Sequence, residues 1–192
     1  MKAVGILGGT FDPIHHGHLI TARAVAEKRD LEKIILIPAN ISPHKLNEEH
    51  TDPTHRFNML DLAIRNEPLF ECSDYEVGKG DISYTIETIK EMKKHYSNLE
   101  LIIGYDNLVK FDKWHKPEEI VSLVKLIVMK REMDKEINIE HKFAAKAQII
   151  DTPTIEISAT DIRQRVRGDL SIEYLVTKEV KEYIYKNKLY RN

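Results

Sequence analysis

The chain has 192 residues, which is enough for one domain with a sizeable core and short for two. Hydrophobic residues make up 42% of it and charged residues 31%, as is typical of a globular protein. The formal net charge of −2 disfavours a general nucleic-acid or membrane surface, because both need a basic field. Any anion site must therefore be a local cluster of donors.

Cysteine usage and hydropathy narrow the class further. The single cysteine, Cys72, excludes an internal disulfide and a cysteine-rich zinc module. No apolar stretch approaches the ~20 residues that span a bilayer, and the apolar start breaks at Gly8 and Gly9 without a cleavage pattern. We therefore expect a reduced, cytoplasmic setting, with neither a membrane nor a nucleic acid as partner.

Short apolar runs alternate along the chain with amphipathic stretches. The apolar runs predict strands at 3–7, 33–38, 70–72, 99–104, 125–129 and 147–150. The amphipathic stretches predict helices at 19–26, 54–66, 84–96, 117–123, 160–167 and 177–187. This alternation is typical of an α/β fold with a mainly parallel sheet that helices cover on both faces.

One domain spanning 1–192 is predicted, with a small helical C-terminal part from about 158. The run 33–38 does not alternate between polar and apolar residues, so it predicts a strand buried on both faces. The stretch 130–146 is charged and weakly patterned, and we expect it to be a variable surface segment.

The segment 8–18 reads Gly-Gly-Thr-Phe-Asp-Pro-Ile-His-His-Gly-His and joins the first predicted strand to the first helix. Glycines in a turn let backbone N–H groups approach a phosphate, and the helix start adds positive potential. His15 and His18 could contact phosphate oxygens there. The segment matches neither the Walker phosphate loop nor the dinucleotide fingerprint. A plain tight turn, surface histidines and a metal-binding pair stay open as alternatives.

Four segments that follow predicted strands carry polar or small residues. They are 8–18, 38–40, 104–106, which is expected to be a turn, and the stretch near Ser158. In an open parallel sheet, ligands bind beyond the carboxyl ends of the strands, where strand order reverses. We therefore expect the four segments to meet on one side of the sheet.

The segment 157–163, Ile-Ser-Ala-Thr-Asp-Ile-Arg, has two interpretations that can both hold. Ser158 and Asp161 are spaced as a capping box at a helix start. The free N–H groups of that helix start, together with Arg163, would also form a grip for phosphate.

These motifs resemble the nucleotidylyltransferase superfamily. Residues 15–18 fit its His-x-Gly-His signature, and 157–163 resembles its Ile-Ser-Ser-Thr-x-x-Arg motif. Within it, the chain is similar to the bacterial nicotinate mononucleotide adenylyltransferases. The matches are 8–15, Ile-x-Pro-His-Lys at 41–45, Ser-Tyr-Thr at 83–85, Ile-Gly-x-Asp at 103–106, Trp114 and the tail 174–190. Ala159, Tyr105 and Lys79 depart from the family pattern and leave fine substrate contacts open.

The resemblance implies a single Rossmann-like domain that joins nicotinate mononucleotide to the α-phosphorus of ATP. The products would be nicotinate adenine dinucleotide and pyrophosphate, in NAD biosynthesis. Because the attacking 5′-phosphate is already an anion, positioning matters more than a general base. Mg²⁺ would arrive with the ATP, bound mainly by substrate oxygens rather than by a protein metal site.

The resemblance also implies a role for each site residue. His15, His18, Lys45 and Arg163 would be the catalytic cations and donors. Gly8, Gly9, Thr10, Phe11, Asp106, Ser158 and Thr160 would bind ATP, with Asp106 on a ribose. Asn40, Ser83, Tyr84, Thr85 and Trp114 would form the mononucleotide side, with Thr85 and Trp114 holding the pyridine ring.

Three alternatives remain beside this interpretation. Phosphopantetheine adenylyltransferases share both phosphate motifs but lack the Ser-Tyr-Thr and tryptophan features. A non-catalytic nucleotide-binding regulator would keep the fold without turnover, and a metal-dependent hydrolase would use the histidines as ligands. The choice between nicotinate and nicotinamide mononucleotide, and a homo-oligomeric state, stay open.

Overall fold

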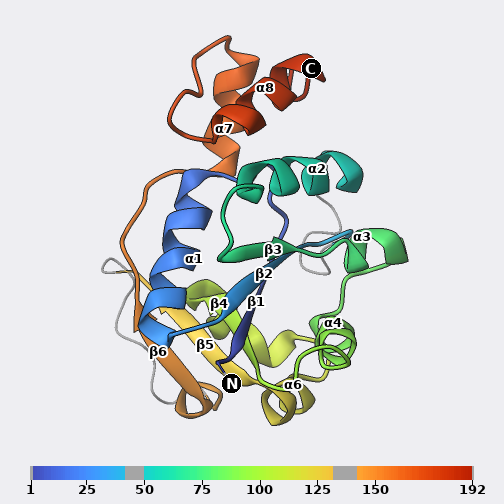
Figure 1. Ribbon diagram of the computed structural model, residues 1–192, viewed down its shortest axis with the longest axis vertical. Helices are drawn as coiled ribbons and strands as arrows, with labels where there is room; N and C mark the ends of the chain where they lie inside the picture. Colours follow the sequence, from blue (N-terminus) through green and yellow to red (C-terminus); the bar gives the residue numbers. More distant parts are fainter. Residues whose placement is uncertain (1, 42–49, 132–141, 192) are drawn as a thin grey trace.

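The computed structural model describes residues 2–41, 50–131 and 142–191. Within them, six strands form one sheet in the order β3-β2-β1-β4-β5-β6 (Figure 1), and every neighbouring pair is parallel. The strands are β1 (Val4–Gly9), β2 (Lys33–Pro38), β3 (Phe70–Cys72), β4 (Leu99–Gly104), β5 (Lys125–Lys130) and β6 (Ala147–Asp151). This order is that of a doubly wound sheet, and it reverses between β1 and β4. The predicted Rossmann-like α/β class is confirmed.

Helices cover both faces of the sheet, as predicted. They are α1 (His16–Arg29), α2 (Pro53–Ile64), α3 (Tyr75–Lys79), α4 (Thr85–Met92), α5 (Tyr105–Val109), α6 (Pro117–Leu123), α7 (Ala159–Arg167) and α8 (Lys178–Lys186). Short 3-10 turns lie at Phe111–Lys113 and Ala144–Lys146. Buried residues of α1 and α2 share one core cluster, and those of α4 and α6 share the other.

Side-chain alternation along β2 shows how one strand serves both clusters. Ile34 and Leu36 belong to the cluster under α1 and α2, whereas Ile35 and Ile37 belong to the cluster under α4 and α6. All four are at most 1% exposed. A strand buried on both faces needs this unbroken apolar run, because each successive side chain points to the opposite face.

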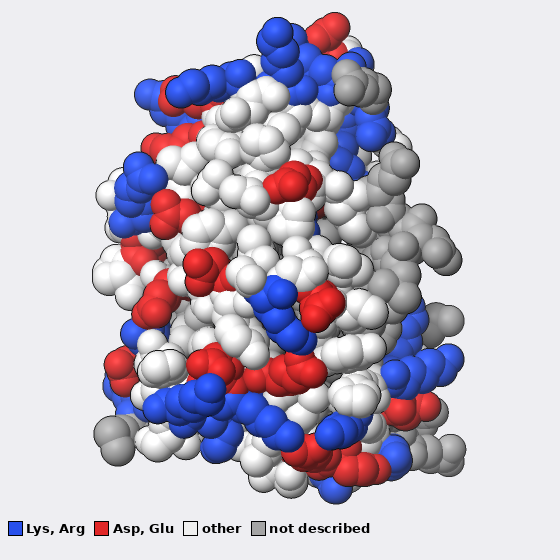
Figure 2. Space-filling model, turned by 90° about the vertical axis from the view of Figure 1, so that its right-hand side faces the viewer, with Lys and Arg blue, Asp and Glu red and all other residues white. Residues whose placement is uncertain are grey.

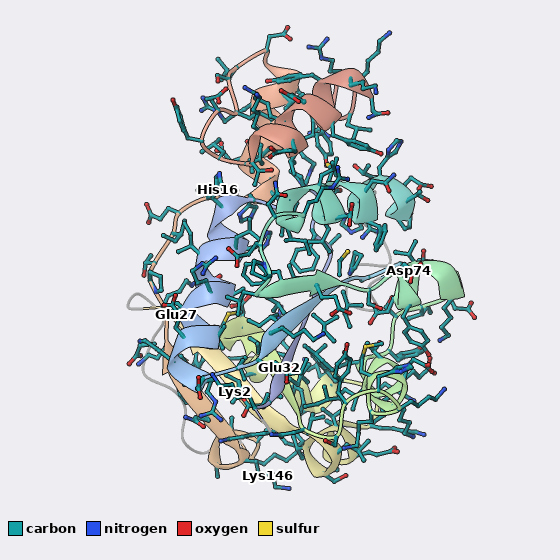
Figure 3. The ribbon with its side chains drawn as sticks, in the orientation of Figure 1. Lys2, His16, Glu27, Glu32, Asp74 and Lys146 are labelled. Carbon is teal, nitrogen blue, oxygen red and sulfur yellow. The ribbon has the colours of Figure 1, made fainter. Side chains whose placement is uncertain are left out.

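The last two helices gather at one end of the molecule, above the carboxyl ends of the strands (Figure 1). The hydroxyl oxygen of Tyr183 in α8 lies 2.9 Å from Nδ1 of His55 in α2. The side-chain amide of Asn58 donates to the same oxygen at 3.0 Å. His16 lies at the start of α1, next to the C-terminal helices (Figure 3). Its N–H donates to the Leu175 carbonyl at 3.0 Å.

Four local predictions were wrong. Gly8 and Gly9 end β1 instead of forming the turn, since they pair with the last two residues of β2. The helix expected at 84–96 ends at Met92, because 93–95 are exposed and offer no apolar face. The segment after Gly104 begins the short helix α5. Phe143, in the expected surface segment, is fully buried against Phe111.

The surface charge reflects the nearly equal numbers of basic and acidic residues in the sequence. On the face shown in Figure 2, basic and acidic side chains are interspersed around uncharged surface. Among the helices of the described residues, none is long and apolar enough to cross a membrane.

Candidate active site

A cavity of about 690 Å³ opens at the carboxyl ends of the strands. Its lining includes residues of β1 and β4, the two strands between which the sheet order reverses. Gly8, Ala39, Gly104 and Ser158 all line it, so the four segments do meet on one side of the sheet. This is the place where an open parallel sheet binds its ligand.

Most of the predicted site residues line this cavity. Those that do are Gly8, Gly9, Thr10, Phe11, His15, His18, Ser83, Thr85, Asp106, Trp114 and Ser158. The cavity lining does not include Asn40, Tyr84, Thr160 and Arg163. Lys45 lies outside the described residues.

His15 and His18 form a stacked pair at the start of α1. Their ring centroids lie 3.6 Å apart at an interplanar angle of 24°, and the edge of Phe11 meets His18 at 5.1 Å. Nδ1 of His18 accepts the backbone N–H of His15 at 3.3 Å. An imidazole that accepts at Nδ1 carries its proton on Nε2 when neutral. His18 therefore presents an N–H donor without needing a positive charge.

Burial keeps both imidazoles neutral. Desolvation, followed by the charge of His16, lowers the pKa of His15 to about 4. Desolvation, followed by the charge of His15, lowers the pKa of His18 to about 3. Nδ1 of His15 is buried and has no hydrogen-bond partner among the described residues. The pair is thus a neutral surface with hydrogen-bonding capacity left for a ligand.

Two glycines make room for these rings. A Cβ at Gly9 would lie 2.8 Å from Cζ of Phe11, and one at Gly17 would lie 3.0 Å from Nδ1 of His15. Both distances are too short for an undisturbed carbon contact. The glycines of the motif are therefore needed for ring packing, beyond any need for a tight turn.

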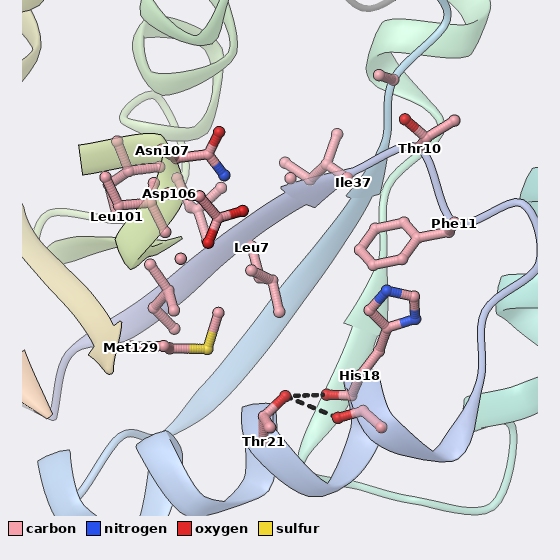
Figure 4. A pocket seen from close by; sticks show the side chains of 18 of the residues that line it. Leu7, Thr10, Phe11, His18, Thr21, Ile37, Leu101, Asp106, Asn107 and Met129 are labelled. Carbon is pink, nitrogen blue, oxygen red and sulfur yellow. Dashed lines mark hydrogen bonds between the residues drawn. The ribbon is translucent and has the colours of Figure 1, made fainter. Parts of the chain in front are cut away.

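Across the cavity, Asp106 projects from α5 opposite His18 (Figure 4). Thr21 holds the first turn of α1 with bonds from its hydroxyl to the carbonyls of Gly17 and His18, at 2.8 and 3.1 Å. Arg131, which the motifs did not predict, also lines the cavity and lies 3.9 Å from Asp106.

The start of α7 faces the same cavity through Ser158. Its hydroxyl oxygen accepts the N–H of Asp161 at 3.0 Å, which confirms the predicted N-cap. Arg163 donates to the carbonyl of Asp12 at 2.7 Å and to Thr160 Oγ1 at 3.3 Å. Arg163 thus ties α7 to the loop before α1, and it is not among the residues that line the cavity.

The mononucleotide side has its own polar network. Ser83 Oγ accepts the Asn40 N–H at 2.9 Å and hydrogen-bonds the buried carboxyl of Glu76, which Thr88 also contacts. Burial raises the pKa of Glu76. Trp114 is half-buried, lines the cavity and packs on Phe111 at 4.9 Å between centroids. It therefore belongs both to the core and to the pocket wall.

The motifs also missed Arg56, which is 1% exposed. Its guanidinium donates to four backbone carbonyls, and two of these belong to residues that line the cavity, Thr10 and Ala39. One arginine in an amphipathic helix usually indicates a solvated position. The helical pattern of α2 therefore held no signal for this residue.

Among the described residues, two carboxylates line the cavity: Asp106 is exposed and Glu76 is buried. The described residues contain no group of three or more histidines, cysteines and carboxylates placed to hold a metal ion. Asp106 offers the hard oxygen ligand that Mg²⁺ prefers, so the lining fits an ion that a nucleotide carries in.

Comparisons with known proteins identify the family of the chain. The model of the cytidylyltransferase-like family matches residues 6–165. A probable nicotinate-nucleotide adenylyltransferase of Clostridium beijerinckii is 40% identical, and the alignment covers all of both chains. The nicotinate-nucleotide adenylyltransferase of Bacillus subtilis is 38% identical, again over all of both. A Plasmodium falciparum nicotinic acid mononucleotide adenylyltransferase complexed with NaAD has the same fold, with a TM-score of 0.79, 20% identity, and coverage of 99% of this chain and 98% of that one.

Proposed function

This chain belongs to the nicotinate-nucleotide adenylyltransferases of the cytidylyltransferase-like family, and we propose that it transfers the adenylyl group of ATP to nicotinate mononucleotide. The products are nicotinate adenine dinucleotide and pyrophosphate. The observation that carries the proposal is one cavity that the His15–His18 pair, the Ser158-capped start of α7 and Trp114 all line.

The reaction brings two anions together. The 5′-phosphate oxygen attacks the α-phosphorus in line, and the bond to the bridging oxygen of pyrophosphate breaks. No base is required, because the nucleophile is ionised already. Positioning of this kind can supply ~7–11 kcal/mol of the barrier. Donors aimed at the transferring group supply further stabilisation.

We assign the ATP phosphates to the β1–α1 loop and the start of α7. The Nε2–H of His18 donates to a phosphate oxygen, as a neutral donor that costs no proton uptake. Ser158 and the free N–H groups of α7 receive the leaving pyrophosphate, with Arg163 one turn further along the same helix. Lys45, by family resemblance alone, bridges the phosphates.

Mg²⁺ that arrives with the triphosphate would supply charge neutralisation, and the exposed carboxylate of Asp106 would be its ligand from the described lining. Asp106 also accepts hydrogen bonds from a ribose. Thr85 and Trp114 hold the pyridine ring, and Asn40 stays close through Ser83. A cytoplasmic setting stays a prediction from composition.

The decisive assay follows pyrophosphate release from ATP and Mg²⁺ with nicotinate mononucleotide, nicotinamide mononucleotide or phosphopantetheine, each alone. We expect rapid release with the first. No release with either pyridine nucleotide would reject the proposal, and release with phosphopantetheine alone would select the alternative enzyme.

The ring assignment has its own test in Trp114→Ala. We expect a KM for the mononucleotide raised by about tenfold, since base–aromatic stacking contributes roughly 1–3 kcal/mol. The KM for ATP should hardly change. A variant that raises the ATP KM alone would contradict the assignment.

A further inference from the structure

Arg56 is a buried cation whose hydrogen bonds go to the backbone. Nε donates to the Thr51 carbonyl at 2.8 Å, and Nη2 donates to the Asn40 carbonyl at 3.0 Å. Nη1 donates to two carbonyls, those of Thr10 at 2.8 Å and Ala39 at 2.6 Å. Desolvation lowers the pKa of this guanidinium, with Asp12 opposing the shift. Burying a cation in this way is costly unless its hydrogen bonds are well made.

The carbonyls that Arg56 contacts belong to different parts of the site. Thr10 follows β1 in the loop assigned to ATP, and Ala39 and Asn40 follow β2. Thr10 and Ala39 both line the cavity. A single nitrogen, Nη1, therefore joins the loop after β1 to the loop after β2. The Ala39 N–H reinforces this junction by donating to the Gly9 carbonyl at 2.9 Å.

The loop after β2 is also held from the mononucleotide side. The Asn40 N–H donates to Ser83 Oγ, and Ser83 in turn contacts the buried Glu76. Asn40 Nδ2 donates to the Asp81 carbonyl at 3.1 Å. Ala39 and Asn40, the two residues after β2, thus both have their carbonyls on Arg56, and Asn40 directs its backbone and side-chain N–H groups to the segment 81–83. They form the connection between the two halves of the cavity.

We infer that Arg56 is a positioning residue that sets the ATP loop and the mononucleotide loop relative to each other. The inference rests on the proposed function, since it assumes that the two substrates occupy these two halves. Arg56 contacts neither reacting group; it acts through the carbonyls of Thr10, Ala39 and Asn40.

The geometry explains why an arginine is needed. A guanidinium has five N–H donors in a rigid planar fork, and here they reach four carbonyls. A lysine ammonium has three donors on one atom, so it cannot span the same set. In-line transfer is sensitive to such spacing, because a misplacement of ~1 Å can cost about 10²-fold in rate.

The test compares Arg56→Lys with a matched control, Arg29→Lys. Arg29 is a partly buried arginine whose Nε and Nη2 donate to the buried carboxylate of Glu100 at 2.9 and 2.5 Å. Glu100 lies near the amino end of β4, away from the cavity end at Gly104. Steady-state kinetics with ATP and nicotinate mononucleotide are measured at a temperature where thermal unfolding shows each variant folded.

We expect Arg56→Lys to lower kcat at least tenfold while both KM values stay within about threefold. Arg29→Lys should lower the melting temperature and keep kcat. Two results overturn the inference: an unchanged kcat for folded Arg56→Lys, or an equal loss of kcat in Arg29→Lys. If Arg56→Lys does not fold, Arg56→Gln takes its place, since the glutamine amide has only two N–H donors. The same two results would then overturn the inference.

Amide hydrogen exchange gives a readout that does not need turnover. Arg56→Lys should speed exchange at 9–12 and 39–41 together, whereas Arg29→Lys should not. Faster exchange in α2 alone would overturn the inference. A wild-type protein that releases no pyrophosphate but shows the linked exchange would defeat the proposed function and leave the coupling of the two loops intact.

Discussion

At the scale of single residues, the cavity presents two neutral histidine rings. The His15 and His18 rings lie stacked in a desolvated corner, and their pKa values of about 4 and 3 leave them uncharged near neutral pH. Because Nδ1 of His18 accepts a backbone N–H, the tautomer that donates at Nε2 is set before any ligand arrives. Preorganised donors of this kind need no rearrangement during the reaction.

Removing one such donor should slow the chemistry without unfolding the chain. We expect His18→Ala to lower kcat by roughly 10²–10³, as for the loss of one transition-state donor. His95→Ala, at an exposed position outside the cavity lining, is the control and should keep wild-type kcat. Turnover and circular dichroism measure the two effects. Wild-type turnover in folded His18→Ala would exclude the phosphate role.

At the scale of elements, two helix starts have the same chemistry and different surroundings. Ser158 caps α7 by accepting the Asp161 N–H, and Thr177 caps α8 by accepting the Val180 N–H. Ser158 lines the cavity, and Thr177 does not appear in its lining. A capped helix start is also an anion site when a ligand can reach it. The two helix starts therefore differ in whether they line the cavity, and not in how they are capped.

The two caps therefore make a matched pair of variants. Ser158→Ala and Thr177→Ala should each lower the free energy of unfolding by about 1 kcal/mol, the usual loss of an N-cap. Only Ser158→Ala should also weaken catalysis, through the pyrophosphate contact. Chemical denaturation and steady-state kinetics on both variants separate the effects. Equal activity in the two would show that Ser158 acts as a cap and nothing more.

At the scale of the whole molecule, the sheet and the C-terminal helices close around one site. We propose that residues 1–192 work as a single domain, because Tyr183 of α8 joins α2 and Tyr190 donates to Asp12 Oδ1 at 2.7 Å. Burial, and then the charge of Asp12, raises the pKa of Tyr190. The chain end is thus tied to the loop that precedes α1.

The buried histidines make stability depend on pH. Their pKa values are lower in the folded state than the unfolded value of 6.5, so the unfolded chain binds protons first. The contribution of the two histidines to the free energy of unfolding is complete above pH 6.5. It should fall by up to about 1.4 kcal/mol per pH unit per histidine as the pH drops toward 4. Denaturant titrations in this window measure the slope.

The double variant His15→Gln/His18→Gln is the control for that slope and should flatten it. The raised pKa of Glu76 acts in the opposite direction, because protonating a buried carboxyl favours the folded state. A slope unchanged in the double variant would show that other groups carry the pH dependence.

Prediction from the sequence succeeded where the signal is local or periodic. Apolar runs predicted the strands of the sheet, and the Ser158 cap followed from spacing alone. Failures lie where tertiary contacts override local pattern. Phe143 lies in the charged stretch after β5 that was expected at the surface, but it is buried and packs against Phe111. Strand β1 extends through Gly9 because Gly8 and Gly9 pair with β2. Local sequence patterns do not predict this pairing.

By itself, the sequence determined the fold class, the motifs at the starts of α1 and α7, and eleven of the residues that line the cavity. Glycine spacing, helix caps and alternation are local constraints, so they can be read along one chain. Only the tertiary structure decided the histidine tautomer and the placement of Arg56 on carbonyls of three separate segments. Desolvation and long-range hydrogen bonds depend on neighbours that are distant in sequence, which is why a buried cation in α2 was indistinguishable from a solvated one.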